Sequence, residues 1–169
     1  MTDKRRTPLY TPEQRLRRDS TRWTLVQGLL APVQFLVFLV SLALVLRTLV
    51  TGQGEAVASA SVVVKTLVLY TIMVTGAVWE KRVFGRYLFA PAFYWEDVFS
   101  MLVLALHTAW LWAHFTGSLG MQGQLWLALA AYATYVINAG QFVLKLRAAR
   151  LDAQRDESSA LVGAVGSAQ

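Results

Sequence analysis

The stretch that decides the fold is residues 24–50, which read TLVQGLLAPVQFLVFLVSLALVLRTLV and contain a single charged residue, Arg47. A helix crosses the apolar part of a bilayer with roughly 20 predominantly apolar residues. Three more stretches of this kind follow, at residues 58–79, 98–116 and 124–144. The sequence therefore predicts an all-α integral membrane protein whose core is a four-transmembrane-helix bundle.

The composition agrees with this prediction. Of the 169 residues, 56% are hydrophobic and only 15% are charged, whereas soluble domains are about 45–50% apolar. We expect the first stretch to stay in the mature chain, because it follows polar residues and is longer than a signal-peptide core. The chain has no cysteine, which excludes disulfides, thiolate metal sites and cysteine nucleophiles.

Lysine and arginine predict the orientation, because they concentrate on the cytoplasmic side of a membrane. Seven lie in residues 1–23, three in residues 80–94 and four from residue 145 onward, while residues 51–57 and 117–123 carry none. Both termini and the long central link are therefore expected in the cytoplasm. The net charge of +6 is explained by this asymmetry and by attraction to anionic lipid. It does not indicate nucleic-acid binding, since no soluble basic domain is present.

The chain divides into three parts. Residues 1–23 form a basic cytoplasmic tail, with a short helix that starts at Pro12 and is capped by Thr11. Residues 24–144 form the membrane domain, in which short outer links make tight antiparallel hairpins. Residues 145–169 are basic and then disordered, because their end is rich in small and polar residues.

The central link is crowded with aromatic residues. Residues 79–101 read WEKRVFGRYLFAPAFYWEDVFSM, and we interpret residues 80–97 as a cytoplasmic aromatic loop. Trp and Tyr collect at any membrane interface, and the charges of the link suit the ends of the flanking helices. The aromatic surplus nevertheless favours a surface for a flat, apolar ligand with a polar edge.

Ionisable groups at membrane depth tend to be functional. On the third stretch, Ser100, His107 and His114 share one helical face, and Glu96 falls close to it. The two histidines are about 10 Å apart along the helix, too far to ligate one metal ion or one haem. His107 could ligate the magnesium of a chlorin, donate a proton or bond to a neighbouring helix, whereas His114 is expected to be structural.

The fourth stretch carries a polar stripe of Thr134, Tyr135, Asn138 and Gln141 at spacings of three and four. Such a stripe either bonds to a neighbouring helix or lines a ligand pocket. Together with Glu96 and His107 it would surround one cavity open to the cytoplasmic leaflet. Lys65 lies in the outer half of the second stretch, and we expect its side chain to snorkel outward.

A family resemblance adds to this reading. It rests on residues 63–111, VVKTLVLYTIMVTGAVWEKRVFGRYLFAPAFYWEDVFSMLVLALHTAWL, and residues 127–153, LALAAYATYVINAGQFVLKLRAARLDA. The chain resembles the BchF family, the 3-vinyl (bacterio)chlorophyllide hydratases of bacteriochlorophyll biosynthesis, from about Leu9 to Ala153.

The resemblance implies a hydro-lyase in the inner, photosynthetic membrane of a bacterium. It would add water to the 3-vinyl group of chlorophyllide a, or of 3-vinyl bacteriochlorophyllide, to give the 3-(1-hydroxyethyl) pigment. Hydration needs no redox cofactor or metal of the protein, and the magnesium belongs to the chlorin substrate. The partners are the pigment and the bilayer, with homo-oligomers and biosynthetic partner enzymes left open.

The product indicates which groups are needed. A proton must reach the terminal vinyl carbon, so the enzyme needs an acid and a base that holds water. Desolvation favours the neutral form of a carboxyl group, and Glu96 is our first candidate for the acid because its helical face continues into His107. Asp97, about 100° away on the helix, is the second candidate, as a base or as a helix cap. Tyr94 and Trp95 are the candidates for binding the ring faces. Lys81, Arg82 and Arg86 are the candidates for the pigment carboxylate, and Asn138 and Gln141 for the polar edge.

Two rival functions remain. The first is a non-catalytic membrane carrier or assembly factor for pigment or haem, with His107 as an axial ligand. The second is a small transporter with Lys65, His107 and Asn138 along its path. Conversion of bound pigment would separate the hydratase from both.

Overall fold

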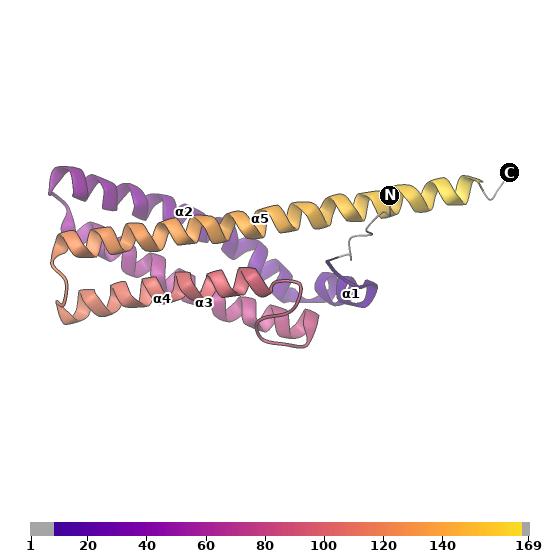
Figure 1. Cartoon of the computed structure of the whole chain (residues 1–169), viewed down its shortest axis with the longest axis horizontal. Coiled ribbons are helices and arrows are strands. Elements are labelled where there is room, and N and C mark those ends of the chain that lie inside the picture. Colours follow the sequence, from indigo (N-terminus) through magenta and orange to yellow (C-terminus); the bar gives the residue numbers. More distant parts are fainter. Residues whose placement is uncertain (1–8, 167–169) are drawn as a thin grey trace, which may run out of the picture.

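The computed structural model describes residues 9–166, with only the backbone at residues 155–157 and 159–166. The described part is all-helical, and Figure 1 shows its long helices side by side. The elements in chain order are α1 (Pro12–Ser20), α2 (Arg22–Thr51), α3 (Glu55–Phe84), α4 (Tyr94–Thr116) and α5 (Met121–Gly166). We call the end of the bundle that carries α1, the link of residues 85–93 and the far half of α5 the basic end.

The four predicted stretches are confirmed as helices. α2, α3, α4 and residues 121–154 of α5 are each long and apolar enough to cross a membrane. Each predicted stretch lies inside one of these helices, and α3 and α4 extend further toward the central link than the sequence indicates. The link is therefore residues 85–93 rather than residues 80–97.

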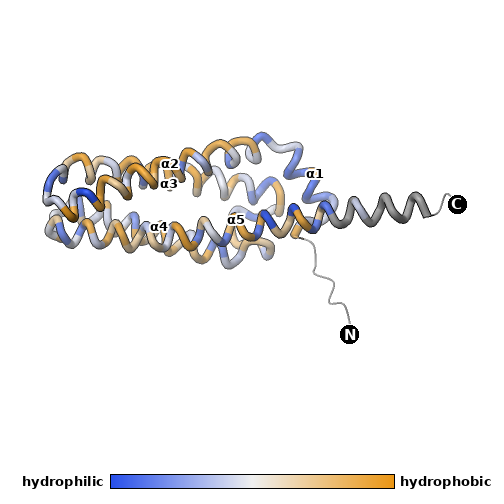
Figure 2. The backbone as a smooth tube through the Cα atoms, turned by 90° about the horizontal axis from the view of Figure 1, so that it is seen from above, coloured by the Kyte–Doolittle hydropathy of each residue, from blue (hydrophilic) through white to orange (hydrophobic). Residues whose placement is uncertain are grey.

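Short turns pair the helices into two antiparallel hairpins. α2 ends at Gly52 and α4 ends at Gly117, both in the left-handed conformation at φ 66°, which glycine adopts without a steric penalty. α2 then packs mainly against α3, and α4 against α5. Figure 2 shows the two hairpins as two layers of the bundle.

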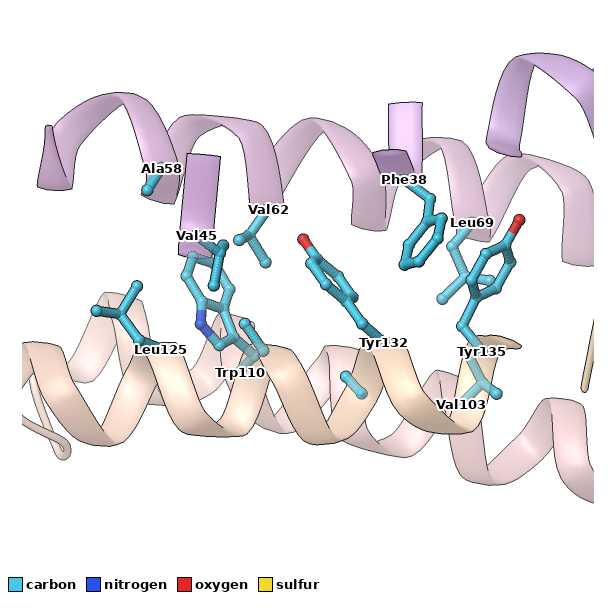
Figure 3. Packing of buried hydrophobic residues seen from close by; sticks show 12 residues of the cluster. Phe38, Val45, Ala58, Val62, Leu69, Val103, Trp110, Leu125, Tyr132 and Tyr135 are labelled. Atoms are coloured by element: carbon cyan, nitrogen blue, oxygen red, sulfur yellow. The ribbon is translucent and has the colours of Figure 1, made fainter. Parts of the chain in front are cut away.

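The core lies between the two hairpins. Figure 3 shows Phe38, Val62 and Leu69 from the first hairpin facing Tyr132 and Tyr135 from the second. Within a bilayer, helices associate through close packing and hydrogen bonds, because lipid is as apolar as the side chains. Hydrogen bonds also join the hairpins: the Ser41 hydroxyl lies 2.5 Å from the Tyr132 hydroxyl and 2.7 Å from the Ser61 hydroxyl, and the Tyr70 hydroxyl lies 2.7 Å from the Thr108 hydroxyl.

The short N-terminal helix is confirmed. Thr11 caps α1, Pro12 is its first residue, and the Gln14 side chain accepts a hydrogen bond from the Thr11 backbone N–H at 2.9 Å. This reciprocal capping box satisfies two backbone donors at the start of the helix.

Two expectations differ from the structure. The segment expected to be disordered from Asp152 continues α5 as far as Gly166, because its Ala, Leu, Gln, Arg and Glu residues are good helix formers; residues 167–169 lie outside the described part. Lys65 does not snorkel outward. Its side chain is fully buried between the helices, since its face of α3 is turned toward the second hairpin.

Candidate active site

Three carboxyl side chains are buried at the basic end. Glu80 comes from the last turns of α3, and Glu96 and Asp97 come from the first turn of α4. They expose 5%, 8% and 3% of their surface, although acidic residues are almost never buried without a partner. We call these residues the carboxyl cluster, and their partners define what the site can do.

Glu80 and Asp97 form a carboxyl pair. Their side chains interact with each other, and two neighbouring buried carboxyl groups favour a state in which one of them is protonated, because two like charges withdrawn from water repel each other. The link supplies donors: the Phe89 N–H lies 2.7 Å from Asp97 Oδ2, and the Ala90 N–H lies 3.3 Å from Glu80 Oε2. A pair of this kind can hold one proton in a site withdrawn from water.

The backbone of the link is strained where it meets this pair. Phe89 has φ 58°, the left-handed region that a bulky side chain rarely adopts. This conformation directs the successive N–H groups of Phe89 and Ala90 toward the two carboxyl groups, as in an anion-binding nest. Strain of this kind persists where the surrounding structure enforces it, and it is common at functional sites.

Glu96 has a different partner. Its Oε2 lies 2.6 Å from Lys145 Nζ of α5, and that ammonium group also lies 5.1 Å from the centroid of the Phe93 ring. Glu96 and Asp97 therefore contact different groups, as their separation on the helix predicts. A carboxylate in an ion pair suits a base or a charge stabiliser better than a proton donor.

Part of the aromatic surplus is internal. The Phe93 ring lies 5.8 Å from the rings of Trp79, Phe84 and Phe142, and Tyr10 stacks on Phe84 at 5.7 Å. These rings join the link to α5 and to the segment before α1. They support the carboxyl cluster instead of forming an open shelf for a ligand.

The remaining aromatic residues are on the surface. Tyr87, Tyr94 and Trp95 expose 60%, 48% and 67% of their area, and the Tyr94 and Trp95 rings meet edge to face at 5.5 Å. Tyr94 and Trp95 directly precede Glu96 in the chain. The two rings predicted to face the ligand are therefore available at the surface beside the carboxyl cluster.

The three predicted cations separate in the structure. Lys81 donates to the Gly85 carbonyl at 2.9 Å, and Arg86 is exposed on the link. Arg82 lines a hollow of about 420 Å³ together with Arg17 and Arg22 of the segments around α1 and α2. Among the side chains that the structure describes, no carboxylate forms an ion pair with these three guanidinium groups, so the hollow suits an anion.

The polar stripes of α4 and α5 face each other deeper in the bundle. Asn138 Nδ2 donates to Ser100 Oγ at 2.8 Å, which brings together two residues that the sequence placed on facing stripes. Among the side chains that the structure describes, Asn138 Oδ1 and Gln141 Oε1 are buried without a hydrogen-bond partner. Two hollows lie at the basic end, around α1.

His107 lies apart from the carboxyl cluster. It follows Asp97 by ten residues, roughly 15 Å along the helix, and is fully buried between the hairpins. His114 bonds through Nδ1 to Gln124 Oε1 at 3.0 Å and stacks on Trp110, which matches its expected structural role.

Sequence reasoning missed Glu80 and Lys145. A signal for Glu80 was present, because an acidic residue near the C-terminal end of a helix is disfavoured by the helix dipole and therefore needs another partner. The pairing of Lys145 with Glu96 had no local signal, since the two residues are 49 positions apart.

Comparison with known proteins fits this geometry. A family model described as 2-vinyl bacteriochlorophyllide hydratase (BCHF) matches residues 10–148. The chain belongs to the BCHF family. It is 72% identical over 145 residues to the 2-vinyl bacteriochlorophyllide hydratase of Cereibacter sphaeroides, a match that covers 85% of this chain and 89% of the relative. It is 65% identical over 157 residues to the protein of the same name in Rhodobacter capsulatus, covering 93% and 91%. No solved structure matches. The matched part of this BCHF chain includes the whole carboxyl cluster, Lys145 and His107.

Proposed function

We propose that this chain is a hydro-lyase that adds water to the 3-vinyl group of chlorophyllide a or 3-vinyl bacteriochlorophyllide in bacteriochlorophyll biosynthesis. The observation that carries the proposal is its 72% and 65% identity, over most of both chains, to relatives named 2-vinyl bacteriochlorophyllide hydratase. The vinyl group numbered 2 in those names is the one numbered 3 here. The product is the 3-(1-hydroxyethyl) pigment.

The Glu80 and Asp97 pair is the proposed acid. The π electrons of the vinyl group take the proton that the pair holds, so the terminal CH₂ becomes a methyl group. Positive charge then develops on the carbon attached to the ring, where the macrocycle delocalises it. The remaining anion of the pair is held by the N–H groups of Phe89 and Ala90, which are fixed before the reaction begins.

Glu96 is the proposed base. Water attacks the ring-attached carbon through its oxygen, and its proton passes to a carboxylate. Glu96 is next to Asp97 in the chain, and its ion pair with Lys145 supports this role. This assignment exchanges the roles first inferred for Glu96 and Asp97, because the partners of the two side chains differ. Return of the proton to the acid pair restores the enzyme, and the net reaction consumes one water.

The surface around the cluster suits the rest of the substrate. Tyr94 and Trp95 flank the macrocycle faces, and the arginine hollow at Arg82, with Lys81 and Arg86 nearby, holds the carboxylate. Glu80 and Arg82 point to opposite faces of α3. The vinyl group and the propionate are carried on neighbouring rings of the pigment. The vinyl group can therefore reach Glu80 while the propionate reaches Arg82. Asn138 and Gln141 offer polar contacts deeper in the seam.

The proposed setting is the inner, photosynthetic membrane, with both termini and the central link in the cytoplasm. The distribution of lysine and arginine supports this orientation, and α2, α3, α4 and α5 are long enough to span a bilayer. The proposed hydration uses no redox cofactor or metal of the protein, because the magnesium is carried by the substrate.

The test is direct. Purified protein in detergent is incubated with chlorophyllide a, and the products are analysed by mass spectrometry. The proposal predicts a pigment heavier by one water, which carries ¹⁸O when the reaction is run in ¹⁸O-labelled water and one deuterium on the new methyl group in heavy water. A protein that binds the pigment and never converts it would instead be a carrier.

A further inference from the structure

Two acceptor oxygens lie in the seam between α4 and α5. Asn138 exposes 9% of its surface, and among the side chains that the structure describes, Asn138 Oδ1 and Gln141 Oε1 are buried without a hydrogen-bond partner. A buried polar group that makes no hydrogen bond lowers the stability of the fold. A donor that reaches these two oxygens would remove this cost. We call the two side chains the amide pair.

Two cross-links between the helices hold the amide pair beside Glu96. At one, Lys145 Nζ lies 2.6 Å from Glu96 Oε2, and at the other, Asn138 Nδ2 donates to Ser100 Oγ at 2.8 Å. Ser100 follows Glu96 by four residues, which places it one turn further along the same face of α4. Gln141 comes three residues after Asn138 and four before Lys145, so it lies on one face of α5 between the two cross-links.

Packing of the helices explains only part of this arrangement. A polar stripe that serves helix association uses its groups to bond across the interface. The bond to Ser100 uses the N–H group of the Asn138 amide and leaves the amide oxygen over, and Gln141 Oε1 makes no bond of this kind to the described part of α4. Both remaining atoms are acceptors, so the group that they bind must be a donor.

A water molecule is the donor that fits. The rim of a chlorin carries carbonyl oxygens and a carboxylate, which accept hydrogen bonds and cannot donate to an amide oxygen. Water has two hydrogens to donate, needs far less room than any part of the macrocycle, and is the usual partner of buried polar groups that lack one in the protein. The Lys145 side chain is 26% exposed and that of Glu96 10%, so solvent reaches the edge of the seam at Lys145.

We propose that Asn138 and Gln141 hold the water molecule that Glu96 activates. This inference rests on the proposed function, because it takes the hydration and the role of Glu96 from it. The water donates one hydrogen to Glu96 and the other to the amide oxygens. Both hydrogens are then held, and a lone pair of the water oxygen is left for the carbon attached to the ring.

The position of this water agrees with that of the acid. The proton and the water add to adjacent carbon atoms of one vinyl group, so the two sites must be neighbours. Asp97 and Glu96 are consecutive, with Cα atoms about 3.8 Å apart, and Asp97 interacts with Glu80 whereas Glu96 contacts α5. As the water oxygen bonds to the ring-attached carbon, one of its protons moves to Glu96. The other stays in the new hydroxyl group and still donates to the amide oxygens.

Deuterium incorporation separates the capture of water from the delivery of the proton. In heavy water the acid places a deuteron on the terminal vinyl carbon. If water does not follow, the cation loses a proton from its methyl group and the recovered substrate carries deuterium on its vinyl group. The measurement is the ratio of deuterated chlorophyllide a to hydrated product, followed by mass spectrometry with the full-length protein in detergent.

Gln141→Met and Asn138→Leu each remove one acceptor oxygen at similar volume. We expect hydration to fall in both variants and the ratio to rise roughly 10-fold to 100-fold, the effect of losing one hydrogen bond to the reacting water. A change that only disturbed the fold or the acid would lower hydration and deuterium exchange together. Thr134→Val is the matched control, because Thr134 belongs to the same stripe and donates to the Ala131 carbonyl at 2.8 Å. It should keep the parent rate and the parent ratio.

The parent protein supplies a second test that needs no variant. Methanol has one hydroxyl hydrogen, so it can donate to Glu96 or to the amide oxygens but not to both. With methanol added, the proposed site should still give only the hydroxyethyl pigment, whereas a base acting alone would also give the methyl ether. Methyl ether formed in proportion to the methanol would overturn the inference, even if neither variant folds.

The remaining outcomes separate the water site from the hydratase. A folded Gln141→Met or Asn138→Leu protein whose ratio stays at the parent value would overturn the inference, whatever its rate. Normal gain of water by the parent protein, together with unchanged ratios, would refute the water site and leave the hydratase intact. A parent protein that adds neither water nor deuterium to any pigment would refute the hydratase.

Discussion

At the scale of single residues, Lys65 carries the clearest cost in stability. Its ammonium group is buried among helices against the Tyr135 ring, and it has no hydrogen-bond partner among the described residues. A cation on an aromatic face gains about 0.5–2 kcal/mol, less than the cost of removing a charge from water. The residue therefore lowers the stability of the protein.

Replacement by an apolar side chain of similar length tests this cost. Lys65→Met should raise the stability of the protein by about 1–3 kcal/mol, seen as a higher midpoint of thermal unfolding in detergent. Lys81→Met, at a lysine exposed on the surface, is the control and should leave stability nearly unchanged. A lower unfolding midpoint for Lys65→Met would show that the ammonium group stabilises the fold.

At the scale of elements, the link of residues 85–93 shapes the carboxyl cluster. The left-handed conformation of Phe89 places two consecutive N–H groups against Asp97 and Glu80. The aromatic side chain of Phe89 is half-buried, so its backbone geometry can be separated from its packing by comparing two substitutions that both remove the ring.

Phe89→Asn and Phe89→Val form that comparison. Asparagine tolerates the left-handed conformation, whereas a β-branched residue there is strained by about 1–2 kcal/mol. We expect Phe89→Asn to keep most of the hydratase rate and Phe89→Val to lose about 10-fold or more, at equal pigment affinity. Equal rates for the two variants would mean that the conformation of the link does not position the acid.

The sequence predicts elements well where the signal is local. The four apolar stretches and the helix cap at Thr11 depend on neighbouring residues, and both are confirmed. The face of α3 that points inward was not predicted, because a lysine in an apolar helix can either snorkel to the interface or be buried between helices, and only the tertiary packing decides between the two. The inward position of Lys65 and the pairing of Glu80 with Asp97 result from tertiary packing, which no local pattern contains.

At the scale of the whole molecule, the basic residues are concentrated at one end of the bundle. The segments rich in lysine and arginine, namely α1, the last turn of α3 and the far part of α5, lie at the basic end (Figure 1). The turns at Gly52 and Gly117 lie at the opposite end and carry no basic residue. Such a distribution predicts that the basic end faces the cytoplasm.

Reporter fusions test this orientation. A reporter placed after Gln169 should be active in the cytoplasm, and a reporter inserted at Gly54 or Gly120 should be active in the periplasm. A periplasmic signal from the fusion after Gln169 would reverse the orientation, and it would also place the carboxyl cluster on the side away from cytoplasmic pigment.

The central claim is that the Glu80 and Asp97 pair delivers the proton to the vinyl group. The most direct measurement is the single-turnover rate of hydration, at saturating chlorophyllide a, for the parent, Glu80→Gln and Asp97→Asn. Both amides keep hydrogen-bonding groups and neither can supply the proton. We predict that both variants bind pigment nearly as well as the parent and lose on the order of 10²–10⁴ in rate. Parental rates in both variants would contradict the claim.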